Sequence, residues 1–145
     1  MTCFGVAKRE TELVGAISFH YNQRHAVELD YAKQLSADHG VPHRTVDLGF
    51  IGQLVTSALT GPGDLSAKHG RLTDLPASFV PSRNALFLTV AHALAQEIEA
   101  SVIYTGVCQT DYSGYPDCRE EFIQSLQHSL NLGYQTNIEI KTPLM

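Results

Sequence analysis

The residues best equipped for chemistry stand together in one stretch, Gly106-Val-Cys-Gln-Thr-Asp-Tyr-Ser-Gly-Tyr-Pro-Asp-Cys-Arg119. It follows a short apolar run and precedes a run with the apolar spacing of a helix, so it connects a strand to a helix. In open α/β sheets, ligands bind in the crevice beyond the carboxyl ends of the strands, where such a connection lies. The stretch is longer than a turn requires. We therefore interpret it as the floor of a small-molecule site, formed by Gly106, Asp111, Tyr112, Ser113, Gly114, Tyr115, Asp117 and Arg119.

Several of these residues also have a purely structural interpretation. Asp117 and Glu120 have the spacing of a capping box, with Asp117 as the N-cap of the following helix. Gly114 and Pro116 fit an ordinary turn, and the two tyrosines fit half-buried loop aromatics. Asp111 has no helix to cap, so its structural alternative is a turn-forming side chain bonded to nearby backbone.

Two further polar stretches fall on predicted loops, Phe19-His-Tyr-Asn-Gln-Arg-His25 after a strand and Phe79-Val-Pro-Ser-Arg-Asn84 at the start of a helix. Helix N-termini offer free N–H groups and the positive end of the helix dipole, which attract phosphates and carboxylates. Arg24 and Arg83 would strengthen such an anion site through bidentate hydrogen bonds. The alternative for either arginine alone is a solvated surface charge. We expect the three stretches to converge at one rim of the sheet.

Apolar periodicity predicts the elements that must position these stretches. Strands are expected at residues 13–19, 43–48, 101–105 and 137–142, and helices at 2–9, 24–39, 51–59, 83–99 and 120–131, the last one terminated by Gly133. Residues 60–81 predict a long loop. The 24–39 helix should carry one apolar face and end at Gly40; that face comprises Val27, Tyr31, Ala32 and Leu35. Strands that alternate with helices predict an α/β fold with a mostly parallel sheet flanked by helices.

The composition limits the classes of protein that fit. A chain of 145 residues, 43% hydrophobic and 17% charged, is one globular domain's worth of sequence. Its net charge of −5 without a Lys/Arg run argues against direct nucleic-acid binding. No apolar stretch is long enough to span a bilayer. The start has no signal-peptide pattern, so we expect a cytoplasmic protein without membrane partners.

Cysteine and histidine give little support for a metal site. The three cysteines stand at no metal-ligand spacing, and we expect reduced, unpaired thiols. A metal-binding domain that uses some of the seven histidines is the alternative from another functional class. The close pairs are His20 with His25 and His39 with His43, and the second pair straddles a glycine and a proline, so its members share no helix face. We predict no metal ligands in this chain.

Taken together, the three stretches resemble the 7-cyano-7-deazaguanine synthase (QueC) family. That family shows the segments Phe-Asp-Tyr-Gly-Gln-Arg-His, Phe-Val-Pro-Gly-Arg-Asn and Gly-Val-x-x-Thr-Asp-x-Ser-Gly-Tyr-Pro-Asp-Cys-Arg. They correspond here to residues 19–25, 79–84 and 106–119, which we call the first, second and third motifs. The closing Lys141-Thr-Pro-Leu-Met145 also matches a family segment. The likeness covers nearly the whole chain and is weakest from residue 50 to residue 77.

The resemblance implies a Rossmann-like fold of the adenine nucleotide α-hydrolase type and a ligase of queuosine biosynthesis. The family uses ATP, with Mg²⁺, to adenylate the carboxylate of 7-carboxy-7-deazaguanine. Ammonia converts the adenylate to an amide, and a second activation dehydrates the amide to the nitrile. A zinc ion is also expected in the family.

The resemblance also implies roles for individual residues. A carboxylate can accept the ring N–H and the exocyclic amine of a deazaguanine, a tyrosine can stack on its ring, and an arginine can neutralise a carboxylate or phosphate. The implied substrate-binding residues are Asp111, Tyr112, Ser113, Gly114, Tyr115, Asp117 and Arg119. The implied ATP-binding residues are Thr2, Cys3, Phe19, Tyr21, Gln23, Arg24, Arg83, Asn84 and Gly106. The implied catalytic residues are Arg24, Arg83 and Asp111.

The chain departs from the family pattern in several places. The family begins with a strand and a Ser-Gly-Gly-x-Asp-Ser loop that cradles the ATP phosphates, and it ends with a zinc-binding cysteine cluster. Neither is present here, so we expect a single truncated domain, residues 1–145, with a sheet incomplete at both ends. Its unpaired edges could pair with a second copy in a homodimer. Within the motifs, His20 replaces Asp, and Asn22 and Ser82 each replace Gly.

Three accounts of these departures remain open. The chain is a fragment of an ordinary family member, a catalytically inactive deazapurine- or nucleotide-binding protein with a regulatory role, or a chain whose phosphate loop comes from another polypeptide. The coding DNA upstream of Met1 distinguishes them through the presence or absence of an in-frame Ser-Gly-Gly-x-Asp-Ser segment.

We predict that the purified 145-residue chain alone has no ATP-dependent synthase activity, because its sequence holds no phosphate-cradling loop. Incubation with 7-carboxy-7-deazaguanine, ATP and ammonia, followed by mass spectrometry of the products, checks this. Formation of the nitrile by this chain would contradict it.

Overall fold

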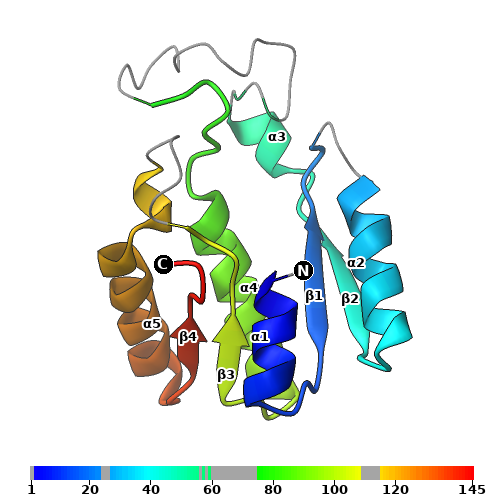
Figure 1. Cartoon of the computed structure of the whole chain (residues 1–145). Coiled ribbons are helices and arrows are strands. Elements are labelled where there is room, and N and C mark those ends of the chain that lie inside the picture. The colour runs from blue at the N-terminus through cyan, green and yellow to red at the C-terminus, as the bar shows by residue number, and fades with distance from the viewer. Residues whose placement is uncertain (1, 24–26, 56, 58, 60–74, 109–114) are drawn as a thin grey trace. The chain divides into compact units, whose positions relative to one another are not determined.

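The computed structural model describes residues 2–23, 27–55, 57, 59, 75–108 and 115–145 (Figure 1). The elements in chain order are α1 (Thr2–Glu10), β1 (Ala16–His20), α2 (Val27–Asp38), β2 (His43–Asp47), α3 (Ile51–Leu54), α4 (Arg83–Glu97), β3 (Val102–Tyr104), the 3₁₀ turn η1 (Pro116–Cys118), α5 (Glu120–Tyr134) and β4 (Glu139–Lys141). They divide into two compact units, Met1–Val14 with Asn84–Met145 (unit one) and Gly15–Arg83 (unit two). The expected single domain over residues 1–145 stays a prediction.

Unit two is built on a parallel strand pair covered by one helix (Figure 1). Strands β1 and β2 pair from Ala16 opposite His43 to His20 opposite Asp47. Helix α2 packs on both strands and supplies the crossover that a parallel pair requires. The helix is followed by Gly40, whose φ of +66° lets the chain turn back toward β2.

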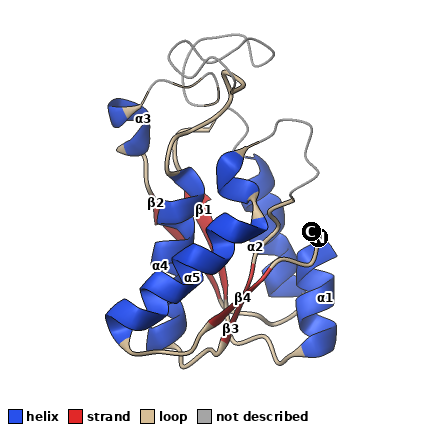
Figure 2. Cartoon of the chain, turned by 90° about the vertical axis from the view of Figure 1, so that its left-hand side faces the viewer, coloured by secondary structure: helices blue, strands red, loops and turns tan. Residues whose placement is uncertain are grey.

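Unit one contains a second parallel pair, β3 with β4, which matches Val102 to Glu139 and Tyr104 to Lys141. Figure 2 shows α4 and α5 on one side of these strands and α1 on the other. The core between the two larger helices and the strands consists of Leu88, Ile123 and Ile140. Four half-buried apolar side chains surround it: Ile103, Val107, Phe122 and Leu126.

A buried polar network joins three elements of unit one around His92, whose side chain has no solvent exposure. Gln96 Nε2, which can only donate, lies 3.0 Å from His92 Nδ1, so Nδ1 accepts and the ring proton is on Nε2. That nitrogen lies 3.2 Å from Asn131 Oδ1 and 3.2 Å from Thr136 Oγ1. Asn131 in turn accepts from Ile138 N at 3.0 Å and donates to Ile138 O at 3.0 Å. One buried histidine therefore ties α4 to α5 and to the segment that leads into β4.

Most predicted elements are confirmed, with small shifts at their ends. The strands predicted at 13–19, 43–48, 101–105 and 137–142 and the helices predicted at 2–9, 24–39, 83–99 and 120–131 are all present. The prediction of an α/β fold with parallel strands flanked by helices is also confirmed. Residues 24–26 and 60–74 lie outside the described part, and with them most of the predicted loop.

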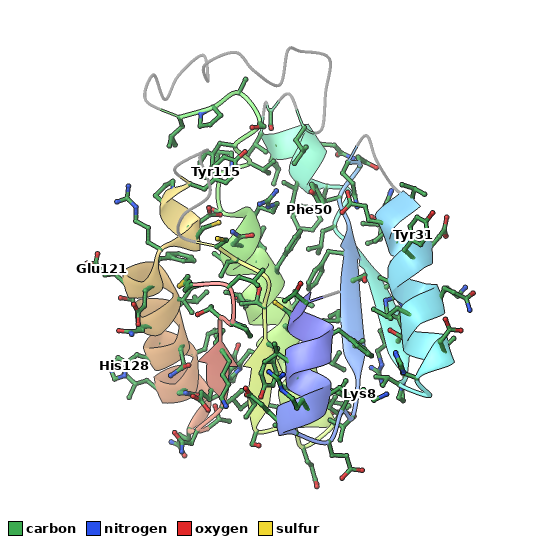
Figure 3. The ribbon with its side chains drawn as sticks, viewed as in Figure 1. Lys8, Tyr31, Phe50, Tyr115, Glu121 and His128 are labelled. Carbon is green, nitrogen blue, oxygen red and sulfur yellow. The ribbon has the colours of Figure 1, made fainter. Side chains whose placement is uncertain are left out.

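Two predictions about helix ends are wrong. The 51–59 helix ends at Leu54, because Val55 is extended (φ −126°, ψ 143°). Helix α5 continues through Gly133 and ends at Tyr134, since Gln135 takes the left-handed conformation (φ 55°) that was expected of the glycine. On the predicted apolar face of α2, Tyr31 is 72% exposed and points away from the strands (Figure 3).

Val27 is also exposed on α2, whereas Ala32 and Leu35 are half-buried. The residue fully buried on this helix is Ser36, whose hydroxyl donates to Ala32 O at 2.9 Å. Among the helices that the structure describes, none has the length and apolar character of a membrane-spanning segment.

We predict that His92→Ala lowers the free energy of unfolding by about 2–4 kcal/mol, because it leaves a cavity and removes the hydrogen bonds of the ring with Gln96, Asn131 and Thr136. Urea denaturation followed by circular dichroism measures this. The matched control is His128→Ala, which removes an exposed histidine of α5 (Figure 3) and should change stability by less than about 0.5 kcal/mol. Equal effects of the two substitutions would contradict the structural role of His92.

Candidate functional site

Residues 19–23 of the first motif form a closed turn at the end of β1 in unit two. The Gln23 side chain holds this turn from both ends: its Oε1 accepts the Tyr21 N–H at 2.9 Å, and its Nε2 donates to Phe19 O at 3.2 Å. Phe19, Tyr21 and Gln23 are all half-buried. The Gln23 side chain therefore fixes the shape of the loop at the carboxyl end of β1. The site was predicted at this edge of the strands.

The second motif meets the first motif through Arg83. The Arg83 guanidinium carbon lies 5.9 Å from the centroid of the Tyr21 ring, within the range of a cation–π contact. Both side chains are half-buried. This contact restrains the position of the guanidinium over the Tyr21 ring. Sequence reasoning selected both residues but did not foresee that they pair.

A polar cluster at the end of β2 was missed by sequence reasoning. Asp47 Oδ1 accepts the Gly49 N–H at 2.8 Å and lies 3.4 Å from His20 Nδ1, while Asn22 Nδ2 donates to Gly49 O at 3.1 Å. The backbone hydrogen bond from Gly49, followed by the contact with His20, lowers the pKa of Asp47 below its usual value. The available signal was the Asp-x-Gly sequence after a predicted strand, which is typical of a side chain bonded to backbone two residues on.

The two residues that replace glycine in the motifs both have left-handed backbone conformations, Asn22 with φ 60° and Ser82 with φ 61°. Glycine adopts this region without a steric cost, asparagine tolerates it, and serine does so less readily. The left-handed backbone explains why the family pattern has glycine at both positions. The backbone of Ser82, next to Arg83, is therefore strained.

In unit one, the start of α1 adjoins the beginning of the third motif. Cys3 Sγ donates to Thr105 O at 3.5 Å, and a Cβ added to Gly106 would lie 3.7 Å from that sulfur. Burial raises the pKa of the Cys3 thiol above its ordinary value. Thr2 is exposed at the first position of the helix. Two expected ATP-binding residues, Cys3 and Gly106, thus lie together at the carboxyl end of β3.

The predicted capping box of Asp117 and Glu120 is wrong. Pro116 begins the 3₁₀ turn η1, which contains Asp117, and the N-cap of α5 is Arg119 with no side-chain capping bond. The Asp117 carboxylate instead lies at the start of α4, where its Oδ2 accepts the Asn84 N–H at 3.4 Å. The aspartate thus caps a different helix, from 33 residues away in the sequence.

The remaining predicted site residues are placed only in part. Arg24, Asp111, Tyr112, Ser113 and Gly114 lie outside the described residues. Tyr115 is half-buried at the start of η1 (Figure 3), and Arg119 is exposed at its end. The convergence of the three motifs on one rim therefore stays a prediction.

Within the described part, no three His, Cys, Asp or Glu side chains are grouped as metal ligands. His43, one of the histidines considered for a metal site, pairs instead with Ser18 across the strands (Nε2 to Oγ, 2.9 Å). Burial, followed by the charge of Lys33, lowers the pKa of His43, so the neutral ring is favoured. His92 is engaged in the core network described above.

Unit one also has an open hollow of about 460 Å³, lined in part by Glu99, Ser101 and Asn137. These residues precede β3 and β4, so the hollow lies at the amino ends of the strands. The motifs follow the carboxyl ends, where ligands of parallel sheets bind. The hollow therefore does not belong to the predicted site.

Comparison with known proteins decides the family. The family described as "Queuosine biosynthesis protein QueC" matches residues 1–145. The chain belongs to the QueC family. It is 44% identical to the 7-cyano-7-deazaguanine synthase of Lysinibacillus sphaericus over 99% of this chain and 65% of the relative. It is 46% identical to that of Helicobacter pylori strain P12, over 96% of this chain and 62% of the relative. The chain thus spans somewhat less than two thirds of the length of these QueC relatives.

We predict that Ser82→Gly raises the free energy of unfolding by about 0.5–1 kcal/mol, because relief of the left-handed strain outweighs the added entropy of the unfolded chain. Thermal and urea denaturation measure it. The control is Asn22→Gly at a matching φ, which should be neutral or destabilising because asparagine tolerates this region and donates to Gly49 O. Destabilisation by Ser82→Gly would show that the serine side chain has a role beyond its conformation.

Proposed function

We propose that this chain serves the 7-cyano-7-deazaguanine synthase reaction of queuosine biosynthesis, the ATP-dependent conversion of 7-carboxy-7-deazaguanine and ammonia to the nitrile. The observation that carries the proposal is 44–46% identity to synthases of that name over 96–99% of the chain. The fold subtype proposed is the adenine nucleotide α-hydrolase type. Its support is that the first and third motifs directly follow the carboxyl ends of parallel strands and the second motif begins a helix.

The third motif is proposed to bind the deazaguanine. Asp111 accepts the ring N–H and the exocyclic amine, and Tyr112 or Tyr115 stacks on the ring. Ser113, Gly114 and Asp117 complete the proposed substrate set, with Arg119 near the substrate carboxylate. The exposure of Arg119 and the partial exposure of Tyr115 are compatible with these contacts.

The remaining motifs are proposed to bind ATP. Arg83, held over Tyr21, and Arg24 face the phosphates, while Phe19 and Gln23 shape the turn beside them. Thr2, Cys3 and Gly106 form the part of the ATP site at the start of α1, where the N–H groups of the first helical turn and the helix dipole favour an anion. Asn84, also expected to contact ATP, has a geometry that favours the different role developed below.

The chemical problem is that a carboxylate is a poor electrophile. Attack of a carboxylate oxygen on the α-phosphorus of ATP releases pyrophosphate and gives the acyl adenylate, from which ammonia can then displace AMP to form the amide. Two anions must approach each other for the first step, so cationic groups at their junction lower the barrier. Arg24 and Arg83 are the proposed cations, and Asp111 orients the deazaguanine for attack.

The proposal includes a metal ion only where ATP or the described residues supply ligands for it. Mg²⁺ would accompany ATP and neutralise phosphate charge. Zinc, expected in the family, does not fit the described residues, which contain no cluster of three potential ligands. The proposed partners are ATP, the deazapurine, ammonia and a second copy of the chain, and the proposed location is the cytoplasm.

A second candidate is a deazapurine- or nucleotide-binding protein without catalysis. It is favoured by His20, which stands where the family has Asp and contacts Asp47 at 3.4 Å, so the local charge at the end of β1 differs from the family pattern. This candidate predicts binding of the same ligands, with no turnover even when a phosphate-loop polypeptide is supplied.

We predict that Asp111→Asn weakens the affinity for 7-carboxy-7-deazaguanine by about 10–100-fold, because a charged acceptor of two hydrogen bonds is lost. Isothermal titration calorimetry, with and without ATP, measures the dissociation constants. Asp30→Asn on the exposed face of α2 is the matched control and should change nothing. Unchanged affinity in Asp111→Asn would remove the base-recognition role, and the absence of binding by the wild-type chain would remove the proposed function.

A further inference from the structure

We propose that Asn84 is a positioning residue that holds the 3₁₀ turn η1 against the start of α4 and thereby places Tyr115 and Arg119 for the substrate. This inference rests on the proposed function, because it deepens the role of the third motif. It assigns Asn84 to the architecture of the deazaguanine site.

The Asn84 side-chain amide donates both of its hydrogens to groups within the protein. Its Nδ2 donates to Asp117 O at 3.3 Å and to Cys118 Sγ at 3.3 Å. An amide nitrogen carries two hydrogens, so this group has none left to donate to a nucleotide. Asn84 is 6% exposed, and both of its partners are 7% exposed. The contact is therefore a buried one between α4 and η1.

The backbone reinforces the same contact. The Asn84 N–H, one of the donors that the first turn of a helix leaves unsatisfied, points to Asp117 Oδ2 at 3.4 Å. A carboxylate at this end of a helix also gains from the helix dipole. Three donor–acceptor pairs thus join two consecutive residues of the third motif to one residue of the second.

Two residues of the proposed substrate site flank η1 directly. Tyr115 is the residue that begins the turn, and Arg119 is the residue that ends it. Both belong to the proposed substrate set, and neither can keep its position if the three residues between them shift. Holding η1 therefore fixes a stacking group and a cation before the ligand arrives, which reduces the ordering cost of binding.

The test uses the full chain and the variant Asn84→Asp, which keeps the size of the side chain and replaces its two donors with acceptors. The new carboxylate then faces the acceptor Asp117 O without a hydrogen to donate, and it has the same charge as the Asp117 carboxylate beside it. Alkylation by iodoacetamide, followed at single cysteines by peptide mass spectrometry, reports the release of η1. We expect Cys118 to react at least about tenfold faster while the rate at Cys3 stays within about twofold, since a local opening exposes one site only.

Ligand binding supplies the readout that a purely structural role would not give. In Asn84→Asp we expect the dissociation constant for 7-carboxy-7-deazaguanine to rise at least about tenfold and that for ATP to change less than about threefold, by calorimetry. Asn84→Ala loses the donors without introducing a charge, and it should give the same pattern with smaller changes. Asn137→Asp, the same chemical change at an exposed site of unit one, is the control and should alter neither cysteine.

The outcomes separate this inference from the function on which it rests. Faster alkylation of Cys3 and Cys118 together would indicate general destabilisation and overturn the positioning role. Unchanged affinity for the deazaguanine in a variant whose Cys118 is released would also overturn it, with the proposed function intact. A wild-type chain that binds neither ligand would overturn the proposed function, and the positioning role would fall with it.

Discussion

The start of helix α4 is the constraint on which the motifs of this chain depend. A helix that begins in a buried position must satisfy the N–H groups of its first turn, and here one of them reaches the carboxylate of Asp117. Consecutive residues then serve different motifs: Arg83 lies against Tyr21 within unit two, and Asn84 bonds to Asp117 and Cys118 within unit one. Each of these two residues of the second motif thus contacts another polar stretch within its own unit.

Local strain accompanies this arrangement. The residue before α4, Ser82, and the residue in the turn after β1, Asn22, both have left-handed backbones. Non-glycine residues in that region persist where surrounding contacts hold them, and such positions cluster at functional sites. The side chain of Asn22 gives it a local partner in Gly49, so the two substitutions for glycine differ in how well the fold accommodates them.

The sequence was informative where structure is encoded locally and less so where it depends on distant partners. Parallel strands, their connecting helices and the three polar stretches follow from periodicity and residue type, and the long third motif was specific enough to indicate the QueC family. Asp117 and Glu120 have the spacing of a capping box, but no such box forms. Asp117 lies in the 3₁₀ turn that begins at Pro116, and its carboxylate accepts the N–H of Asn84, 33 residues earlier in the sequence. No pattern among the residues next to Asp117 in the sequence indicates that its carboxylate contacts the start of α4.

The same limit explains the other differences. Tyr31 has the spacing of a core-facing residue, yet the strands of unit two leave it exposed. His92 sits in an apolar helix, and its function as a buried connector is visible only once Asn131 and Thr136 are placed beside it. Gln135 ends α5 in place of the expected glycine, since a non-glycine residue can also adopt the left-handed turn that helix ends use.

The central claim is that three stretches far apart in the sequence bind one charged, purine-like ligand. Hydrogen exchange measured by mass spectrometry, on the chain with and without 7-carboxy-7-deazaguanine and ATP, tests it most directly. The account predicts that hydrogen exchange at the amides of residues 19–25, 79–84 and 106–119 slows when both ligands are present, whereas exchange in helix α2 is unchanged. Protection confined to a single stretch, or absent from all three, would contradict it.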